Sequence, residues 1–487
     1  MTRIARLVVL MLALSCANAN AGPVVIGSKA FTESVILGEL ATQMLRNGGI
    51  EARHQRELGG TAVLWSSLRR GDLSCYAEYT GTLRAEIYAR EAAGTDAQLA
   101  ALLQRDAIWA SPPIGFNDTY VLGMRKAAAQ KLSVMRMSDL VSHPGLRLAF
   151  SNEFLDRADG WPGLRAAYGL PQADVRGMDH DLAYRALAAG SIDVTDLYST
   201  DAEIAYYDLV TLQDDRHYFP AYDALFLCRA DVAPDVRKVF EQLAGTIDAP
   251  TMARLNAQAK LDHVPEAKVA QAFIRDALGV ESRIAKDSRS ARLLRRTLEH
   301  LSMVGLSLLA AVPFAVALGV LAFRRPRLSR PIFAVADVLQ TIPALALLVF
   351  LIPWLGIGYA PAVTALFVYS LLPILRNTHA GLADIPQDLR DSADALGLSS
   401  RARLRFIEMP LAARSILAGI KTAAVINVGT ATLGALIGAG GYGQSILTGI
   451  RLDDHALILE GAVPAALLAL AVQWAFGMLE RRWVRVH

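Results

Sequence analysis

The sequence predicts an exported α/β domain followed by an all-α membrane domain of five transmembrane helices. Three features predict this arrangement: a secretory signal at the start, alternating strand-like and helix-like segments in the first half, and long apolar stretches in the second. The chain has 487 residues, enough for two or three domains. Its residues are 53% hydrophobic and 20% charged, which is more apolar than most soluble proteins.

Residues 1–21 have the parts of a signal peptide. Arg3 and Arg6 precede a short apolar core, and the A-N-A at 19–21 is a small-residue cleavage site. The core is too short to span a bilayer comfortably, so we expect cleavage before Gly22.

The cysteines leave two questions open. Cys16 raises a lipoprotein anchor as an alternative to cleavage before Gly22, although the Ala-Leu-Ser before it matches a lipobox poorly. Cleavage would leave Cys75 and Cys228. An oxidising periplasm permits a disulfide between them, but sequence does not show whether the geometry fits. We expect two separate buried thiols, with the disulfide as the alternative.

The exported domain is predicted at 22–285. Short apolar runs there alternate with helical patterns, which predicts an α/β domain with a mainly parallel sheet. Strands are predicted at 24–28, 146–150, 193–199 and 223–230, and helices at 33–47, 182–190 and 234–246.

The membrane domain is predicted at 297–487, after a linker or amphipathic segment at 286–296. Helices satisfy their own backbone hydrogen bonds in lipid, so each long apolar stretch is interpreted as one span. The spans are predicted at 300–323, 331–353, 359–375, 415–438 and 457–479.

Arginines concentrate on alternate connections between these spans. The positive-inside rule places the connections that they occupy, and the C-terminus, in the cytoplasm, with the exported domain outside. Arg292, Arg295 and Arg296 lie on the outer side, where we expect an amphipathic helix at the membrane surface. The cytoplasmic set is Arg324, Arg325, Arg327, Arg330, Arg376, Arg390, Arg401, Arg403, Arg405 and Arg414.

The longest cytoplasmic loop, 376–414, contains DSADALGLSSRARLRFIEMP at 391–410. This segment resembles the "EAA" loop of bacterial ABC importer permeases, which docks on an ATPase subunit. An amphipathic loop in solvent is the alternative. The residues that match this motif are Asp391, Ala393, Gly397, Ile407 and Pro410.

The stretch QTIPALALLVFLIPWLGIGYAPAVTALFVYSLLPILRNTHAGL resembles the permease subunits of the quaternary-ammonium importers for glycine betaine, choline and carnitine. The likeness covers nearly all of 297–480. It implies a bacterial inner-membrane homodimer. No G-x-x-x-x-G-K-[ST] motif occurs, so we expect no cofactor on this chain, and ATP would be used by a separate cytoplasmic ABC ATPase subunit.

The exported half resembles glycine betaine/choline-binding proteins over about 24–285. The resemblance implies a two-lobed, type II-like periplasmic binding protein that closes by a hinge, with the second lobe at about 113–220. Six motifs carry it: VVIGSKAFTESVILGEL, YAEYTGTL, FNDTYVLGM, SNEFLDRADGWPGL, DLYSTDAEI and FPAYDALFLCR.

The resemblance also implies a box of aromatic rings around a quaternary ammonium group. Such a group carries its charge on methyls and cannot donate ordinary hydrogen bonds, so ring faces suit it. The motifs place Tyr79, Tyr120, Tyr198 and Tyr222 in this box, with Asp118 as the nearby acid.

The same match places four residues around the ligand's other end: Lys29, Thr82, Glu153 and Arg157. Arginine suits a carboxylate because its planar fork bonds both oxygens. The presence of Lys29 and Arg157 therefore slightly favours a betaine as the solute over choline, because choline has no carboxylate. An i,i+4 pair with Glu153 on a solvated helix is the alternative for Arg157.

Import of glycine betaine or choline has alternatives. Ergothioneine, which also combines a trimethylammonium with a carboxylate, is an alternative solute. A membrane-anchored sensor would need a cytoplasmic signalling domain, and only RRWVRVH follows the last span. No H-E-x-x-H or G-x-S-x-G motif indicates an enzyme. A net charge of +3 without a basic run does not indicate nucleic-acid binding.

Overall fold

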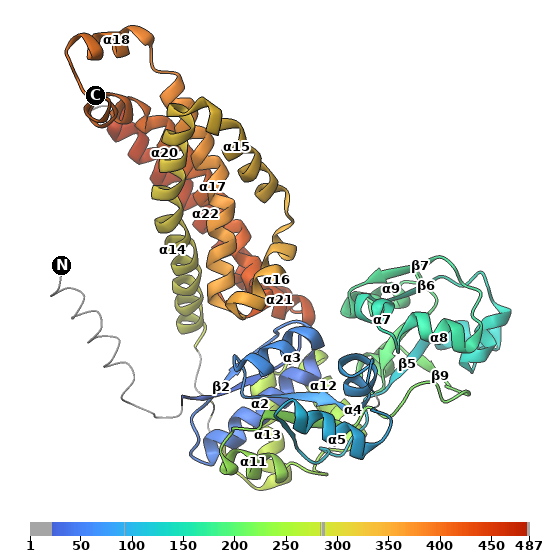
Figure 1. The fold of residues 1–487 in the computed structure, drawn as a ribbon. Coiled ribbons are helices and arrows are strands. Elements are labelled where there is room, and N and C mark those ends of the chain that lie inside the picture. The colour runs from blue at the N-terminus through green and yellow to red at the C-terminus, as the bar shows by residue number, and fades with distance from the viewer. Residues whose placement is uncertain (1–21, 92, 283, 285–287, 485–487) are drawn as a thin grey trace.

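The computed structural model describes residues 22–91, 93–282, 284 and 288–484. The predicted signal peptide, 1–21, lies outside these residues, as do positions 286 and 287 of the predicted linker. The chain forms two α/β lobes and a long helical bundle that stands on the first lobe (Figure 1). The predicted fold class, a two-lobed α/β domain followed by a helical membrane domain, is confirmed.

The first lobe contains a five-stranded sheet of β1 (Val24–Gly27), β2 (Ala52–Gln55), β3 (Cys75–Tyr79), β4 (Ile108–Ala110) and β10 (Ala224–Arg229). The strand order is β2-β1-β3-β10-β4. Every residue of β3 is buried. Its alternate residues enter different hydrophobic clusters, Cys75 and Ala77 on one side and Tyr76 on the other, because successive strand side chains point to opposite faces. Tyr76 is thus a core residue.

Helices cover both faces of this sheet. The helix α2 packs against α12 and α13 on one face. On the other face, Leu64 and Leu68, one helical turn apart on α3, join the cluster that contains Tyr76. The helical elements are α2 (Thr32–Asn47), α3 (Thr61–Arg70), α4 (Thr80–Thr82), η1 (Leu83–Ile87), α5 (Asp96–Arg105), α11 (Pro234–Glu241), α12 (Ala249–Lys260) and α13 (Glu266–Leu278).

The second lobe contains an antiparallel sheet in the order β8-β5-β9 and a parallel pair, β6-β7. Its strands are β5 (Tyr120–Arg125), β6 (Leu148–Ser151), β7 (Val175–Met178), β8 (Thr195–Tyr198) and β9 (Leu209–Leu212). Its helices are α6 (Lys126–Leu132), η2 (Met137–Ser142), α7 (Asn152–Asp156), α8 (Trp161–Tyr168), α9 (His180–Ala188) and α10 (Glu203–Tyr206).

The expectation of a mainly parallel sheet is right for β1, β2, β3 and β4 of the first lobe, which run in one direction, and wrong for β10, which runs against them. β10 runs antiparallel to β3 and β4, and β5 runs antiparallel to β8 and β9. Residue patterns identify strands but do not give their direction. β10 enters the first lobe only after the chain has passed through the second, which reverses its direction in the sheet.

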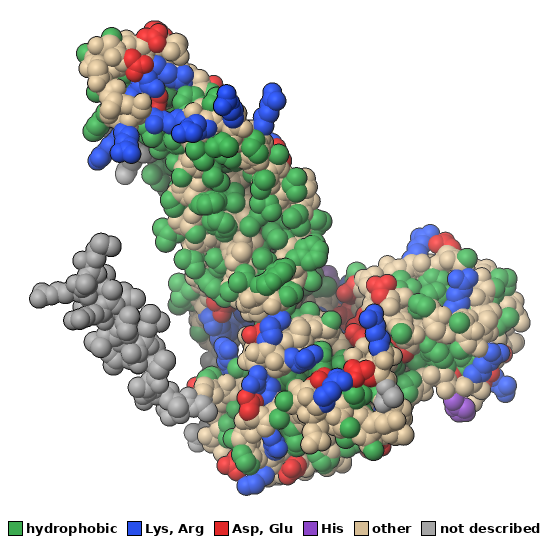
Figure 2. Space-filling model, in the orientation of Figure 1, with side chains coloured by type: hydrophobic (Ala, Val, Ile, Leu, Met, Phe, Trp, Pro, Cys, Tyr) green, Lys and Arg blue, Asp and Glu red, His purple; other side chains and the backbone are tan. Residues whose placement is uncertain are grey.

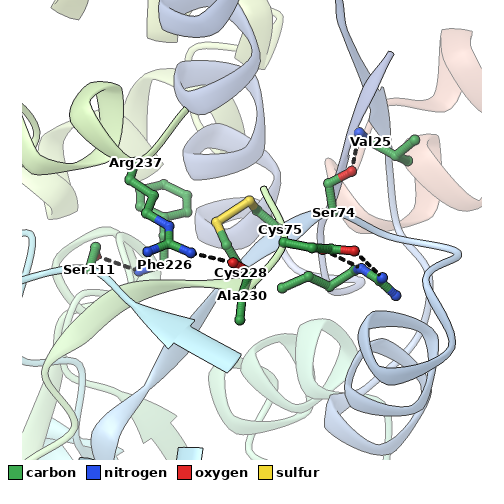
Figure 3. The surroundings of a disulfide bond; sticks show 10 residues. Val25, Ser74, Cys75, Ser111, Phe226, Cys228, Ala230 and Arg237 are labelled. Atoms are coloured by element: carbon green, nitrogen blue, oxygen red, sulfur yellow. Dashed lines mark hydrogen bonds and ion pairs between the residues drawn. A yellow bond between two sulfur atoms is a disulfide. The ribbon is translucent and has the colours of Figure 1, made fainter. Parts of the chain in front are cut away.

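The expectation of two separate thiols is also wrong, because Cys75 and Cys228 form a disulfide. The two residues lie directly opposite each other in the antiparallel β3–β10 register, with 4.1 Å between their Cα atoms. Figure 3 shows the bond beside the hydrogen bond from the Val25 nitrogen to Ser74. The cysteines are 153 residues apart in the chain, so only the strand pairing reveals that they meet.

The described residues of the membrane half form helices joined by short connections. Its long helices α14, α17, α20 and α22 pack side by side. The elements are α14 (Arg289–Arg324), α15 (Pro326–Thr341), α16 (Ala344–Leu355), α17 (Tyr359–Ala383), α18 (Gln387–Ala395), α19 (Ser400–Arg403), η3 (Leu404–Glu408), α20 (Met409–Thr430), η4 (Ala431–Ile437), α21 (Tyr442–Arg451) and α22 (His455–Val484).

The second predicted span, 331–353, is not a straight helix. α15 and α16 meet at an angle of 99° across Ile342 and Pro343. Ile342 is extended, with φ −66° and ψ 125°, because a proline disfavours the helical conformation in the residue before it. The described residues contain four helices long and apolar enough to cross a membrane, or five if the bent pair forms one span.

The predicted amphipathic segment at 286–296 is not separate from the first span. From Arg289 onward it belongs to α14, which continues unbroken to Arg324. Acidic partners accompany its arginines: Arg292 pairs with Glu460 at 2.6 Å, and Arg296 with Glu299 at 3.1 Å.

The surface of the bundle divides into bands. Figure 2 shows hydrophobic side chains over its visible middle and Lys and Arg at the end farthest from the binding lobes. Large exposed apolar residues such as Leu309, Phe350 and Trp474 lie in this half. A lipid-facing belt is the ordinary reason for such exposure.

We predict that replacing Cys75 and Cys228 together by serine lowers the stability of the first lobe by about 2–5 kcal/mol, since the bond closes a long loop. Thermal unfolding of the purified chain, followed by near-ultraviolet circular dichroism, measures the shift. The wild type with reductant should match the double variant. An unchanged melting temperature would contradict the prediction.

Candidate functional site

A cavity of about 20 Å³ lies between the two lobes. This is room for about one water molecule, so the lobes must separate to admit a solute. All nine residues predicted as ligand contacts line it, together with Phe31. The lining is Lys29, Phe31, Tyr79, Thr82, Asp118, Tyr120, Glu153, Arg157, Tyr198 and Tyr222.

The ends of strands position the tyrosines. Tyr79 is the last residue of β3, in the first lobe. Tyr120 begins β5 and Tyr198 ends β8, and these two residues are direct partners in the antiparallel register. A cross-strand pair places both side chains on one face of the sheet. The second lobe therefore presents two rings toward the first.

The rings form a connected aromatic wall. Ring centroids lie 5.2 Å apart for Tyr120 and Tyr198, and 5.6 Å apart for the edge-to-face pair Tyr120 and Tyr222. Phe31 stacks on Tyr198 at 5.7 Å and on Tyr79 at 6.4 Å. These spacings are typical of favourable aromatic pairs. Residues from both lobes thus surround the cavity with ring surface.

The small T-G-T after Tyr79 makes room for one of these rings. A Cβ atom added at Gly81 would lie 2.5 Å from ring atoms of Tyr222. Any larger residue would displace the ring. Thr80 donates its backbone N–H to the Asp223 carbonyl at 3.0 Å, which holds the same two segments together.

Two tyrosine hydroxyls are anchored by buried acids. Tyr79 donates to Glu33 Oε1 at 2.6 Å, and Tyr222 donates to Asp159 Oδ2 at 2.5 Å. Burial and the neighbouring negative charges raise the pKa of both hydroxyls well above their ordinary value. Both rings therefore remain neutral.

The two predicted cations have partners within the chain. Lys29 Nζ lies 2.6 Å from Glu78 Oε1 and donates to Thr61 at 2.9 Å. Arg157 is only 5% exposed, so the alternative of a solvated helix surface fails for it. Its guanidinium lies 2.6 Å from Asp159 and 2.5 Å from Glu86, whereas Glu153 is 3.9 Å away.

The hydroxyl of Thr200 lies between the carboxyl groups of Asp118 and Glu33. Thr200 Oγ1 lies 2.5 Å from Glu33 Oε2 and 2.8 Å from Asp118 Oδ1. A hydroxyl has a single hydrogen to donate, so a proton on one carboxyl completes the pair of bonds. Burial raises the pKa of Glu33 to about 7, which fits a protonated state. Burial and the Glu33 charge raise the pKa of Asp118 as well.

Sequence reasoning missed five residues around the cavity: Phe31, Glu33, Glu78, Glu86 and Asp159. Four of them lie inside the quoted motifs, so their positions were visible. Nothing in the sequence shows which of its many carboxylates point inward. Which acids pair with Lys29 and Arg157 depends on which carboxylates the folded chain buries beside them.

Comparisons with known proteins identify the families to which the two halves are similar. Residues 22–276 match the family described as the substrate binding domain of ABC-type glycine betaine transport systems, over more than half of the chain. This chain belongs to that family. Residues 291–485 of the importer match the family described as the binding-protein-dependent transport system inner membrane component. Both families are transport components rather than enzymes, and such a permease works with an ATPase partner.

Individual relatives of the importer cover mainly its permease half. The choline transport system permease protein OpuBB of Bacillus subtilis is 38% identical over 195 residues, 40% of this chain and 90% of the relative. The carnitine transport permease protein OpuCB of Listeria monocytogenes is 42% identical over 190 residues, 39% of this chain and 87% of the relative. A crystal structure of a glycine betaine/carnitine/choline ABC transporter is 28% identical. It covers 52% of this chain and 97% of its own, with a TM-score of 0.45.

The segment predicted to contact the ATPase lies at the end of the importer farthest from the binding lobes, where Figure 1 labels α18. Asp391 and Ala393 lie on α18, and Gly397 follows it with φ +70°. Ile407 lies in η3, and Pro410 is in the first turn of α20. The structure thus has a helix, a tight turn and a second helix here.

At the opposite end, α21 of the importer docks on the binding domain. Arg451 pairs with Glu57 and with Glu266, each at 2.5 Å, and all three side chains are at most 5% exposed. Arg451 Nη1 also donates to Thr32 Oγ1 at 2.9 Å. Asp453, just beyond α21, pairs with Arg185 of the second lobe. The membrane half therefore contacts both lobes.

The first turn of α2 connects this junction to the cavity. Phe31 lines the cavity, Thr32 bonds Arg451, and Glu33 accepts the Tyr79 hydroxyl. Three consecutive residues therefore join the aromatic wall to the permease. A change in the cavity can reach α21 without passing through a flexible loop.

We predict that Gly397→Asp abolishes uptake and weakens co-purification of the ATPase. An L-residue at φ +70° costs about 1–2 kcal/mol and would distort the turn after α18. The matched control is Gly169→Asp, since Gly169 has φ +66° and, like Gly397, open space around its Cβ position. Intact uptake in Gly397→Asp would rule out the assignment of this loop.

We predict that Arg451→Met leaves solute affinity within about threefold but reduces uptake at least tenfold. The change removes the cation paired with Glu57 and one of the two cations paired with Glu266, and breaking a buried ion pair costs up to about 3–5 kcal/mol. Uptake of radiolabelled solute by cells that carry the ATPase measures the effect. Arg254→Met, on an exposed face of α12, is the control. Equal loss of binding and uptake would contradict a coupling role.

Proposed function

We propose that this importer binds a quaternary-ammonium solute of the glycine betaine, choline or carnitine type outside the cell and passes it through its own membrane domain. A separate cytoplasmic ATPase supplies the energy. The observation that supports this proposal is the interlobe cavity, where five aromatic side chains and two acids, Asp118 and Glu153, meet. Relatives described as choline and carnitine permeases support the same solute class.

A trimethylammonium group matches this lining for a physical reason. Its methyls offer no hydrogen to a carbonyl or hydroxyl, so it gains most from the negative faces of neutral rings. Rings from both lobes line the cavity, Tyr79 from the first and Tyr120 and Tyr198 from the second. A solute that contacts both lobes favours their closure. Capture and closure would be one event.

We further propose that the binding domain lies in the periplasm and that two copies of the chain form the translocation path. The arginine-rich end of the bundle is opposite the binding lobes, which fits a cytoplasmic position under the positive-inside rule (Figure 2). The α18 turn lies at that same end. A pore formed by two permease halves would give each ATPase subunit one such turn to contact.

Calorimetry of the purified full chain tests the solute class. Glycine betaine, choline, carnitine, proline betaine and ergothioneine are titrated separately. We predict that Tyr198→Ala weakens binding of the preferred compound by about 2- to 30-fold, the effect of losing a ring worth about 0.5–2 kcal/mol.

Two matched variants make this test specific. Tyr198→Phe keeps the ring and should bind as the wild type does, whereas Tyr206→Ala removes a tyrosine that is 63% exposed in the same lobe. Failure of every trimethylammonium compound to bind would refute the proposed function.

A further inference from the structure

The guanidinium of Arg157 is already held by acids of this chain. Its Nε and Nη2 donate to the two oxygens of Asp159 at 2.8 and 2.6 Å, the bidentate arrangement that a ligand carboxylate would need. Its Nη1 donates to Glu86 at 2.5 Å. The Nε–Nη2 side of the guanidinium, which could bind a carboxylate, is therefore occupied by a neighbouring side chain, and the charge of Arg157 is balanced within the chain.

The ammonium of Lys29 is in the same situation. Its partner Glu78 is fully buried, at 2.6 Å. A solute carboxylate could replace Glu78 at Lys29, or take the Nε–Nη2 side of Arg157, only by displacing one of these acids. Displacement would leave Glu78 or Asp159 buried without its cation, which is strongly unfavourable.

Asp118, in contrast, has no cationic partner in the part of the chain that the structure describes. It accepts bonds from Thr200 and Ser199, all at Oδ1, and the nearest charges acting on it are Glu33 and Asp201, both acidic. It lines the cavity beside the rings. A cation placed in the aromatic box would supply the missing charge.

Even with a proton on one carboxyl of the Glu33–Asp118 pair, the cavity and its immediate partners carry more carboxylates than cations. Two basic residues, Lys29 and Arg157, face a larger set of carboxylates. The acids that line the cavity or bond directly to its lining are Glu33, Glu78, Glu86, Asp118, Glu153 and Asp159.

We propose that this site selects a quaternary ammonium cation without a carboxylate, such as choline, over zwitterions such as glycine betaine. The proposal rests on the proposed function and narrows it. Asp159, Glu86 and Glu78 act as specificity-determining residues because they neutralise the two groups that would otherwise bind a carboxylate. A choline hydroxyl can donate to Glu153 or accept from Thr82, which line the same cavity.

Competitive calorimetry on the full chain tests this. We expect choline to bind at least tenfold more tightly than glycine betaine at the same pH and salt concentration. Asp159→Asn frees the fork of Arg157 while keeping an acceptor for Tyr222, and should reduce the choline preference at least fivefold. Glu78→Gln frees Lys29 and should act in the same direction.

The control is Asp231→Asn, which removes the partner of Arg229 at an exposed surface pair of the first lobe. It should leave the preference unchanged. If Asp159→Asn fails to fold, Glu86→Gln, at a partly exposed carboxylate, carries the same test.

The outcomes separate this inference from the proposed function. Wild-type affinity for glycine betaine equal to or above that for choline overturns the inference and leaves the proposed function standing. A preference that none of the three variants changes also overturns it. If neither compound nor any other trimethylammonium solute binds, both proposals fail.

Discussion

The pairing of β10 with β3 is the constraint on which the binding half depends. β10 returns from the second lobe and lies antiparallel to β3, which sets Ala224 opposite Tyr79 and Cys228 opposite Cys75. The residues just before β10 then cross the T-G-T turn, where Gly81 admits the ring of Tyr222. One register thus fixes the disulfide, one wall of the cavity and the crossing between the lobes.

Burial of charge is the second organising principle. Charged groups removed from water persist only when they are paired and hydrogen-bonded. Lys29 and Arg451 meet this requirement with acids from distant parts of the chain, and Arg157 meets it with the neighbouring Asp159 and the distant Glu86. At the cavity, these ion pairs neutralise Lys29 and Arg157 and thereby affect which charge on a solute can bind. At the junction it joins the binding domain to the helix that follows η4.

The sequence predicted much of this architecture because its signals are local. Apolar stretches of membrane length, strand and helix patterns and the six binding-protein motifs each lie within a few dozen residues. The bend at Pro343 could have been expected from the proline alone, since it disfavours helix in the residue before it. The size of the bend, 99°, depends on packing and could not have been expected from the sequence.

The features that sequence could not predict are those between distant residues. The Cys75–Cys228 bond spans 153 positions, and strand direction has no residue signature. All nine predicted ligand contacts lie around one cavity, yet the acids that hold Lys29 and Arg157 were not identified. Arg451 was not recognised as a docking residue either, because its partners Glu57 and Glu266 lie 394 and 185 positions away.

The central claim is that an aromatic cavity closes between two lobes on a quaternary ammonium ion. Distances between nitroxide labels at Met135 of the second lobe and Lys238 of the first, both exposed, test it most directly in the full chain. The account predicts that choline converts a broad distance distribution into a short, narrow one, and that Tyr198→Ala raises the choline concentration needed for this conversion by about 2- to 30-fold. A distribution that no quaternary ammonium compound changes would contradict the account.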